Sequence, residues 1–182
     1  MKIIFIGIVD FSYHCLSEVL ANNGQVSGVI TSENRKNNSD YSDLKPLSED
    51  HNIPIHFSNN VNSKETIGWV RKMEPDIIFC FGWSQLIGKE LLSIPKMGII
   101  GSHPTMLPEN RGRHPLIWSI ILGLEECGLT FFFMDEGADS GPIFSQERIE
   151  ILRSDSAYDL YNKIKTSASK QIKDFLPRLM NK

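Results

Sequence analysis

The chain is poor in cysteine and has no long apolar run. Its three cysteines, Cys15, Cys80 and Cys127, are odd in number and widely spaced, which indicates neither a disulfide framework nor a zinc site. We therefore predict no bound metal, and we expect Cys80 to be a small core residue. Because no stretch of about 18 apolar residues is present, no membrane span is expected. The amino-terminal apolar stretch is too short for a signal peptide, so the expected compartment is the cytoplasm.

A block of basic residues is also missing. The chain has 19 Lys and Arg residues against 22 Asp and Glu residues, which gives a formal net charge of −3. Nucleic-acid binding requires a positive face, so this balance argues against nucleic acid as the main ligand. No repeat or linker interrupts the 182 residues, and that length suits one folding unit. We predict a single domain over residues 1–182.

Short apolar stretches alternate with segments of helical periodicity. The expected strands cover residues 3–6, 25–30, 53–57, 77–81, 97–100, 129–134 and 143–151. The expected helices cover residues 11–20, 44–51, 64–73, 116–122 and 157–176, the fourth of them largely buried with Trp118 in the core. Residues 31–43 lack apolar periodicity and predict a surface loop. Continuously apolar strands are typical of strands covered on both faces. The predicted fold class is therefore α/β, a mostly parallel twisted sheet with helices on both faces.

The most informative segment has a histidine directly after an expected apolar strand. It reads Gly101-Ser102-His103-Pro104-Thr105-Met106-Leu107-Pro108. A second segment, Met134 to Pro142, places Asp139 on a glycine-rich turn after another apolar strand. The ligand of an open α/β sheet lies at the carboxyl ends of the strands, where we expect both segments. His103 and Asp139 brought together are typical of an acid/base pair.

From Phe81 to Gln146 the chain resembles the folate-dependent formyltransferase family, and in size and loops it resembles the sugar N-formyltransferase branch. The family pattern is Asn-x-His-Pro-Ser-Leu-Leu-Pro, then Arg-Gly, then Asp-x-Gly-Pro or Asp-x-Gly-Asp. The matching residues here are His103 to Pro108, Arg111-Gly112, and Asp139 to Pro142. The resemblance implies a Rossmann-like catalytic domain that moves a formyl group from 10-formyltetrahydrofolate, its cosubstrate, to an amine.

The resemblance also implies roles for individual residues. His103 would stabilise the oxyanion of the tetrahedral intermediate, and Asp139 would keep the imidazole charged and receive the proton of the amine. The family's Asn, an oxyanion donor, falls where this chain has Gly101, and we nominate Asn110 or an ordered water as its replacement. The folate would lie on the segment after the fourth expected strand, which consists of Gly82, Trp83, Ser84, Gln85, Leu86 and Ile87. The loop that contains Asp135 and Ala138 would close over it.

The basic residues Arg111, Arg113 and His114 are expected to face an anionic substrate. The tRNA-charging branch of the family carries a further RNA-binding domain that these 182 residues do not contain, so we expect another branch. The purine branch cradles a phosphate in a Gly-Ser-rich loop after the first strand, whereas the loop here contains Asp10. We predict formyl transfer to the amine of a nucleotide-linked amino-deoxysugar used in polysaccharide biosynthesis.

Other interpretations stay open. One alternative is phosphoribosylglycinamide formyltransferase of purine synthesis. A second alternative is a catalytically weak folate- or nucleotide-binding module, which is motivated by Gly101 in place of the family's Asn. A third is a hydrolase, in which the same acid/base pair activates water to release formate. The sequence identifies neither the sugar nor its nucleotide, and it leaves the oligomeric state open, with a homodimer as one option.

Overall fold

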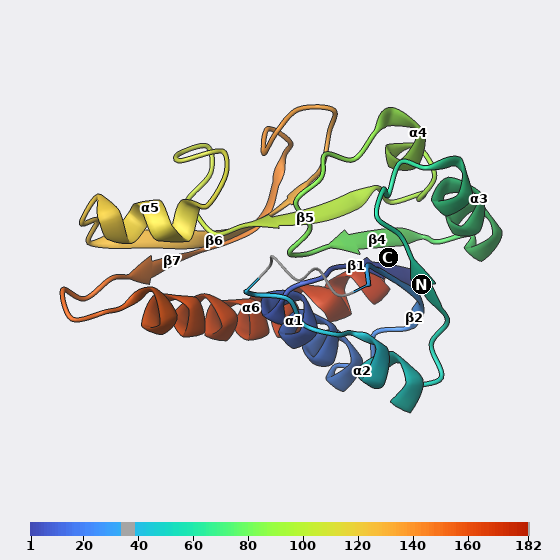
Figure 1. Cartoon of the computed structure of the whole chain (residues 1–182), viewed down its shortest axis with the longest axis horizontal. Coiled ribbons are helices and arrows are strands. Elements are labelled where there is room, and N and C mark those ends of the chain that lie inside the picture. The colour runs from blue at the N-terminus through green and yellow to red at the C-terminus, as the bar shows by residue number, and fades with distance from the viewer. Residues whose placement is uncertain (34–38, 182) are drawn as a thin grey trace.

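The computed structural model describes residues 1–33 and 39–181. Seven strands form one sheet in the order β3-β2-β1-β4-β5-β6-β7 (Figure 1). Their bounds are β1 Ile3–Ile6, β2 Val26–Thr31, β3 Ile55–Phe57, β4 Ile77–Cys80, β5 Ile99–His103, β6 Glu126–Phe133 and β7 Ile143–Glu150. The helices are α1 Asp10–Ala21, α2 Lys45–Asp50, α3 Lys64–Met73, α4 Lys89–Leu92, α5 Pro115–Ile121 and α6 Ala157–Met180. The expected loop at 31–43 includes residues 34–38, which lie outside the described residues.

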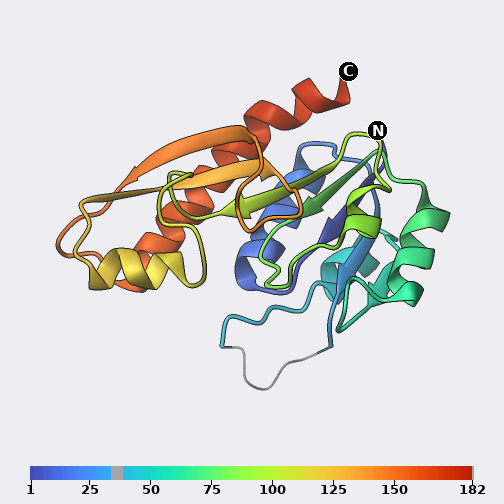
Figure 2. The ribbon, with the colours of Figure 1, turned by 90° about the horizontal axis from the view of Figure 1, so that it is seen from above.

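Side chains of the central strands alternate between two buried layers, as the pleat requires. Ile3 and Phe5 of β1 belong to a first core cluster with α1 and α6, whereas Ile4 and Ile6 belong to a second core cluster with α3 and α4. Figures 1 and 2 show α1 and α6 side by side on one face of the sheet. Both faces are therefore covered by helices, as the continuously apolar strands predict. Cys80 is buried in the second core cluster, which confirms the expectation of a core residue.

The sheet changes direction at β6. Strands β1 to β5 pair in parallel, but β6 pairs antiparallel with both β5 and β7. The carboxyl end of β6 consequently lies beside the amino end of β5, where the Met134 N–H donates to the Ile99 carbonyl at 2.8 Å. The expectation that the Asp139 turn follows a strand at the carboxyl edge of the sheet is therefore wrong. The turn starts at the opposite edge and returns over β5.

The expectation of a largely buried helix at 116–122 is also wrong. Only one side of α5 reaches the first core cluster, through Leu116 and Ile120. The other side is open, and Trp118 is 54% exposed, which contradicts its expected place in the core. Apolar residues all around a short helix cannot all be covered when it packs at the edge of the sheet. Among the described helices, none is long and apolar enough to cross a membrane.

Candidate active site

His103 is the last residue of β5, and its side chain is buried at the carboxyl end of the parallel strands. Its Nδ1 atom lies 3.5 Å from Oδ2 of Asp139, and its Nε2 atom lies 3.0 Å from the backbone carbonyl oxygen of Asn110. Both ring nitrogens thus face acceptors. The site is arranged around a buried imidazole whose Nδ1 atom faces a carboxylate oxygen.

Asp139 connects the loop after β5, which contains Arg111 and Gly112, to its own turn between β6 and β7. Its Oδ2 atom accepts a hydrogen bond from the Gly112 N–H at 3.2 Å, and its backbone carbonyl accepts one from Arg111 Nε at 2.9 Å. Its backbone lies in the left-handed region, with φ of 53°. Non-glycine residues adopt this conformation at some energetic cost, so the loops hold the carboxylate in a fixed position against His103.

The return of the turn over β5 depends on close backbone contacts. Gly141 lies against the Phe133 carbonyl, where a Cβ atom would come within 1.7 Å of the oxygen, and the Phe133 N–H donates to the Pro142 carbonyl at 2.9 Å. Within the turn, Oδ1 of Asp135 accepts hydrogen bonds from the Gly137 N–H and the Ser140 hydroxyl. Asp135 thus shapes the turn from inside, and its predicted contact with folate stays a prediction.

Gly101 lies on the same face of β5 as His103 and is covered by the return of the turn. A Cβ atom at this position would meet Met134 Cγ at 2.9 Å and Phe132 Cζ at 3.2 Å. Met134 therefore fills the space that the family's Asn would need. The nominated substitute, Asn110, reaches His103 with a backbone carbonyl, which is an acceptor, while the residue is otherwise exposed. Its role as an oxyanion donor stays a prediction.

The segment Gly82–Ile87 follows β4 at the same edge of the sheet. None of its backbone N–H groups has a hydrogen-bond partner within the described part of the chain. The segment is held from outside, because Gln85 donates to the Asn59 carbonyl and Asn62 both donates to the Leu86 carbonyl and accepts from the Gly88 N–H. A fixed segment with unpaired donors is suited to a flat ligand with acceptors along its edge, as the pterin of a folate has. Sequence reasoning missed the Asn59–Asn62 support because no motif marks it.

Trp83 adds a side-chain donor to this segment. Its indole nitrogen is buried and has no partner among the described residues, and the ring lines a narrow hollow with Ile8, Ser84 and Gln85. This hollow lies where the turns after β1 and β4 diverge, the point at which open α/β sheets bind ligands. Leu86 is exposed, whereas Ile87 is buried in the second core cluster and can offer a ligand only its backbone. The unpaired donors of this segment therefore fit the acceptors of a folate, although the hollow beside Trp83 is too narrow to hold the ligand itself.

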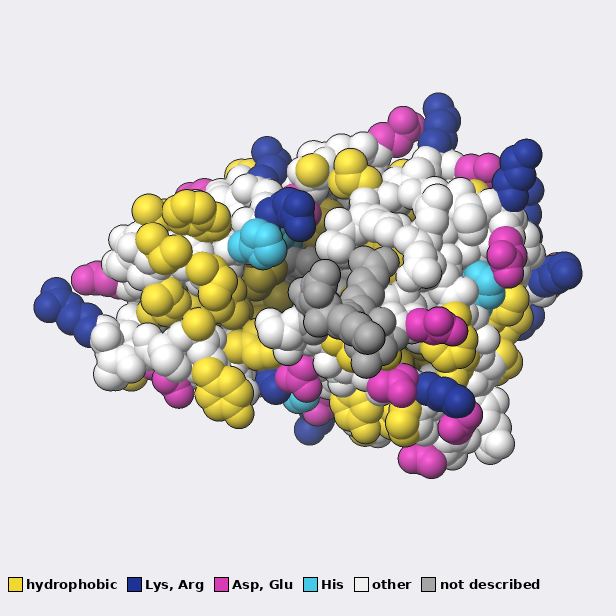
Figure 3. Space-filling view, viewed as in Figure 1, with side chains coloured by type: hydrophobic (Ala, Val, Ile, Leu, Met, Phe, Trp, Pro, Cys, Tyr) yellow, Lys and Arg dark blue, Asp and Glu magenta, His cyan; other side chains and the backbone are white. Residues whose placement is uncertain are grey.

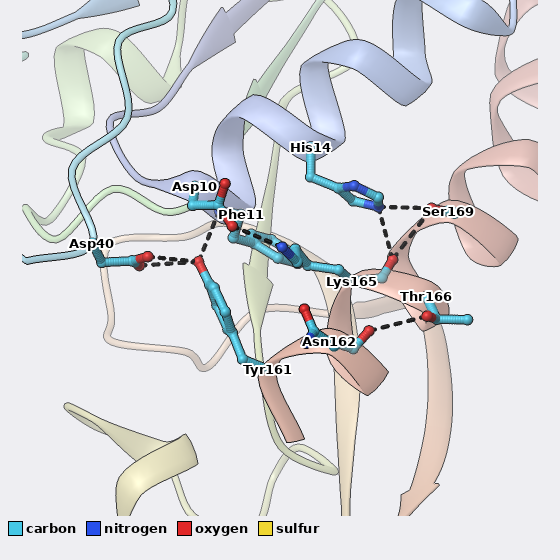
Figure 4. A network of polar contacts seen from close by, with 9 residues as sticks. All are labelled: Asp10, Phe11, His14, Asp40, Tyr161, Asn162, Lys165, Thr166 and Ser169. Atoms are coloured by element: carbon cyan, nitrogen blue, oxygen red, sulfur yellow. Dashed lines mark hydrogen bonds and ion pairs between the residues drawn. The ribbon is translucent and has the colours of Figure 1, made fainter. Parts of the chain in front are cut away.

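The turn after β1 is closed by the protein itself (Figure 4). The Phe11 N–H donates to the Tyr161 hydroxyl at 2.8 Å, and the Asp10 N–H donates to the Asp40 carbonyl at 2.9 Å. The Tyr161 hydroxyl in turn donates to both carboxylate oxygens of Asp40, and Lys165 pairs with Asp10 at 2.8 Å. Burial raises the pKa of Asp40 and of Tyr161. Two of the N–H donors that could hold a phosphate at the start of α1, those of Asp10 and Phe11, are therefore occupied.

The predicted substrate residues differ in how the structure uses them. Arg111 braces the Asp139 turn, as described above. Arg113 and His114 are exposed, and neither side chain has a hydrogen-bond or ion-pair partner in the described part of the chain. Ala138 is exposed on the turn. A group of three or more His, Cys, Asp or Glu side chains able to hold a metal ion is not present among the residues described.

Comparison with known proteins decides the family. The sequence profile described as formyl transferase matches residues 1–176. The chain belongs to this formyl transferase family. Its fold agrees with that assignment, since phosphoribosylglycinamide formyltransferase from Bacillus halodurans superposes with a TM-score of 0.85 over 100% of this chain and 96% of that one, at 22% identity. The predicted Rossmann-like α/β fold and the predicted family are both confirmed.

Members of the family with different acceptors resemble this chain. Methionyl-tRNA formyltransferase from Clostridioides difficile is 32% identical over 97% of this chain and 58% of its own length. The N-formyltransferase from Helicobacter canadensis, solved with folinic acid and dTDP-3-aminofucose, covers 100% of this chain and 63% of its own, with a TM-score of 0.75 and 22% identity. The chain thus spans somewhat over half the length of the curated relatives that it matches. Folate-dependent formyl transfer is the chemistry common to these proteins, whereas their acceptors differ.

Proposed function

We propose that this chain transfers the formyl group of 10-formyltetrahydrofolate to the amine of a nucleotide-linked amino-deoxysugar. The observation that carries the transfer chemistry is the contact between His103 and Asp139 across two separate loops, beside the unpaired donors of Gly82–Ile87. The predicted single domain over 1–182 would contain the whole reaction centre.

Residue chemistry supports the following mechanism. The folate supplies a formyl carbon, which the amine nitrogen attacks, so that a C–N bond forms and the carbonyl oxygen becomes an oxyanion. His103 would stabilise that oxyanion by a charge-assisted hydrogen bond from Nε2, which requires the oxyanion to replace the Asn110 carbonyl as the acceptor of that N–H. Asp139 accepts the proton that the amine nitrogen loses, directly or through water. The carbonyl would then re-form as the bond from the formyl carbon to folate N10 breaks, and N10 would take up the proton that Asp139 had accepted, directly or through water.

Two observations favour a nucleotide sugar as acceptor. Arg113 and His114 follow directly after Gly112, which contacts Asp139, so unpaired basic groups lie next to the reaction centre. They suit the diphosphate that links a sugar to its nucleoside. By contrast, the turn after β1 is poorly suited to a ribose phosphate, because the Asp10 and Phe11 N–H groups already donate to Asp40 and Tyr161 and the turn carries the carboxylate of Asp10. This arrangement argues against the purine alternative.

Methionyl-tRNA is a second candidate acceptor, favoured by the curated relatives. The basic residues beside the site would suit the phosphates of a tRNA acceptor end as well as those of a nucleotide sugar. We expected another branch because these 182 residues lack the further RNA-binding domain of the tRNA-charging enzymes. The similarity to methionyl-tRNA formyltransferases nevertheless makes methionyl-tRNA an acceptor that must be tested.

A substrate panel separates the candidates. The protein would be incubated with 10-formyltetrahydrofolate and, in turn, a dTDP-linked amino-deoxysugar, glycinamide ribonucleotide, methionyl-tRNA or no amine, and the release of tetrahydrofolate would be followed by absorbance. We expect turnover with the nucleotide sugar alone. Turnover restricted to another amine would replace the proposed acceptor, turnover without amine would indicate a hydrolase, and folate binding without turnover would indicate a binding module.

A further inference from the structure

The outward face of α5 carries more apolar surface than a short surface helix normally does. Ile117, Trp118, Ile121 and Leu122 are 46%, 54%, 64% and 61% exposed. Figure 3 shows hydrophobic side chains gathered at the end of the molecule that α5 occupies in Figure 1, with a histidine and a cationic side chain at their border. Large side chains left exposed together mark a binding surface more often than a packing fault.

This face begins at the reaction centre. The Gly112 N–H contacts Asp139, Arg113 and His114 come next, and the Trp118 N–H donates to the His114 carbonyl at 3.2 Å. One helical turn therefore separates the unpaired basic residues from the exposed indole. In order outward from the reaction centre, the surface presents a carboxylate, two basic side chains and a flat aromatic ring.

A nucleotide-linked amino sugar has the same order of groups. Its amine is followed by the sugar ring, an anionic diphosphate, a ribose and a flat base. Resting on the function proposed above, we infer that the base of the acceptor stacks on Trp118 while its diphosphate lies against Arg113 and His114. Charge complementarity fixes the diphosphate, and base–aromatic stacking adds affinity without requiring a particular base.

A second copy of the chain is the rival occupant of this face. The four side chains expose on the order of 500 Å² together, less than the roughly 800 Å² that each partner of a stable interface contributes. The unpaired basic groups at one end of the face also suit an anionic ligand better than a self-complementary contact, since a two-fold axis would bring like charges together. The nucleotide is the occupant that these observations favour.

The test compares Trp118→Ala, Trp118→Phe and a matched control, Ile121→Ala, on the same helix face. We expect Trp118→Ala to raise the KM for the nucleotide sugar roughly tenfold to a hundredfold, with kcat and the KM for 10-formyltetrahydrofolate unchanged. Trp118→Phe should retain most of the affinity, and Ile121→Ala should stay within about threefold of the unaltered chain. Equal effects of Trp118→Ala and Ile121→Ala, together with a concentration-dependent change in sedimentation, would overturn the inference in favour of a self-association surface.

A fluorescence titration with free dTDP or UDP keeps this inference separable from the proposed function. Nucleotide should quench tryptophan emission in the unaltered chain, and Trp118→Phe should lose that quenching although Trp69 and Trp83 remain. Quenching without transfer to any amino sugar would support the stacking and overturn the proposed function. Sugar formylation with an unchanged KM in Trp118→Ala would overturn the stacking and leave the proposed function standing.

Discussion

At the scale of single residues, Asp139 performs two tasks with one carboxylate. Its Oδ2 atom lies against His103 and also accepts the Gly112 N–H, so the same atom pairs the imidazole and ties two loops together. An Asp139→Ala substitution would have three effects together: it would remove the negative charge, remove the hydrogen bond from the Gly112 N–H, and place alanine in a left-handed backbone conformation. Asparagine separates these effects, because it adopts the left-handed region more readily than most residues and its amide oxygen can still accept from Gly112.

We therefore expect Asp139→Asn to lower kcat/KM by about 10²–10⁴-fold while leaving the melting temperature near that of the unaltered chain. The measurement is steady-state kinetics combined with thermal unfolding. Glu136→Gln is the matched control, since it removes one exposed carboxylate from the same turn, where Glu136 pairs with Lys89. Retention of a third or more of the activity by Asp139→Asn would contradict the proposed proton acceptor.

Gly101 can be tested by restoring the residue of the family pattern. Because Met134 and Phe132 already fill the space above Gly101, we expect Gly101→Asn to destabilise the chain by about 1–3 kcal/mol and to reduce activity. Adding Met134→Ala should recover part of the lost stability, since the nearest atoms belong to that side chain. Urea unfolding of the two single variants and the double variant measures the coupling. Simple additivity would show that Met134 is not the obstacle.

At the scale of elements, the antiparallel β6 decides how His103 and Asp139 are brought together. A parallel β6 would have delivered the next turn directly to the His103 edge of the sheet. Instead the turn starts beside Ile99 and crosses the face of β5, which requires small residues where the backbone passes close. Gly141 is the tightest of these positions, because a Cβ atom there would lie 1.7 Å from the Phe133 carbonyl oxygen.

Gly141→Ala should consequently displace the turn, abolish formyl transfer and lower stability by several kcal/mol, of the order seen when a side chain is forced into filled space. Gly68→Ala is the matched control in α3. A Cβ atom at Gly68 meets nothing within 4 Å, so this substitution should stabilise the helix by about 0.5–1 kcal/mol. Denaturant unfolding and activity would be measured on both variants. An active, stable Gly141→Ala protein would show that the turn has another route.

At the scale of the whole molecule, the core determines how the three thiols behave. Burial raises the pKa of Cys80 to about 12 and that of Cys127 to about 11, and it also raises the pKa of Cys15. The folded chain keeps these thiols protonated at pH values where the unfolded chain, with ordinary thiol pKa values near 9.0, releases their protons. The thiols therefore contribute stability that is complete below pH 9 and is lost as the pH rises toward 11–12.

We expect the native chain to react with a thiol reagent at pH 8 only at the rate of unfolding, and its free energy of unfolding to fall between pH 9 and 11. Each thiol contributes a slope of up to about 1.4 kcal/mol per pH unit in this range. The measurements are thiol labelling with and without denaturant, and urea unfolding across the pH range. Cys80→Ala should flatten the decline by one such contribution. Rapid labelling of the folded chain would contradict the buried positions.

Sequence patterns predicted the strands well because buried strands and amphipathic helices leave local periodicity. They failed at β6 and α5 for a shared reason. Strand direction depends on which neighbour pairs with it, and the burial of Trp118 depends on how far the sheet extends beneath its helix. Likewise, the closure of the α1 turn joins Phe11 to Tyr161, residues so far apart that no local pattern connects them.

The order of amino acids alone indicated the α/β class and the family, and it singled out His103 and Asp139 as the proposed acid/base pair, because each inference rests on a short run of neighbouring positions. Only the tertiary structure decided that the Asp139 turn crosses β5 to reach His103, that Met134 fills the space above Gly101 and that Trp118 faces outward beside Arg113 and His114. These features depend on which distant segments pack against one another, and in a close-packed interior that is determined only when the whole chain folds.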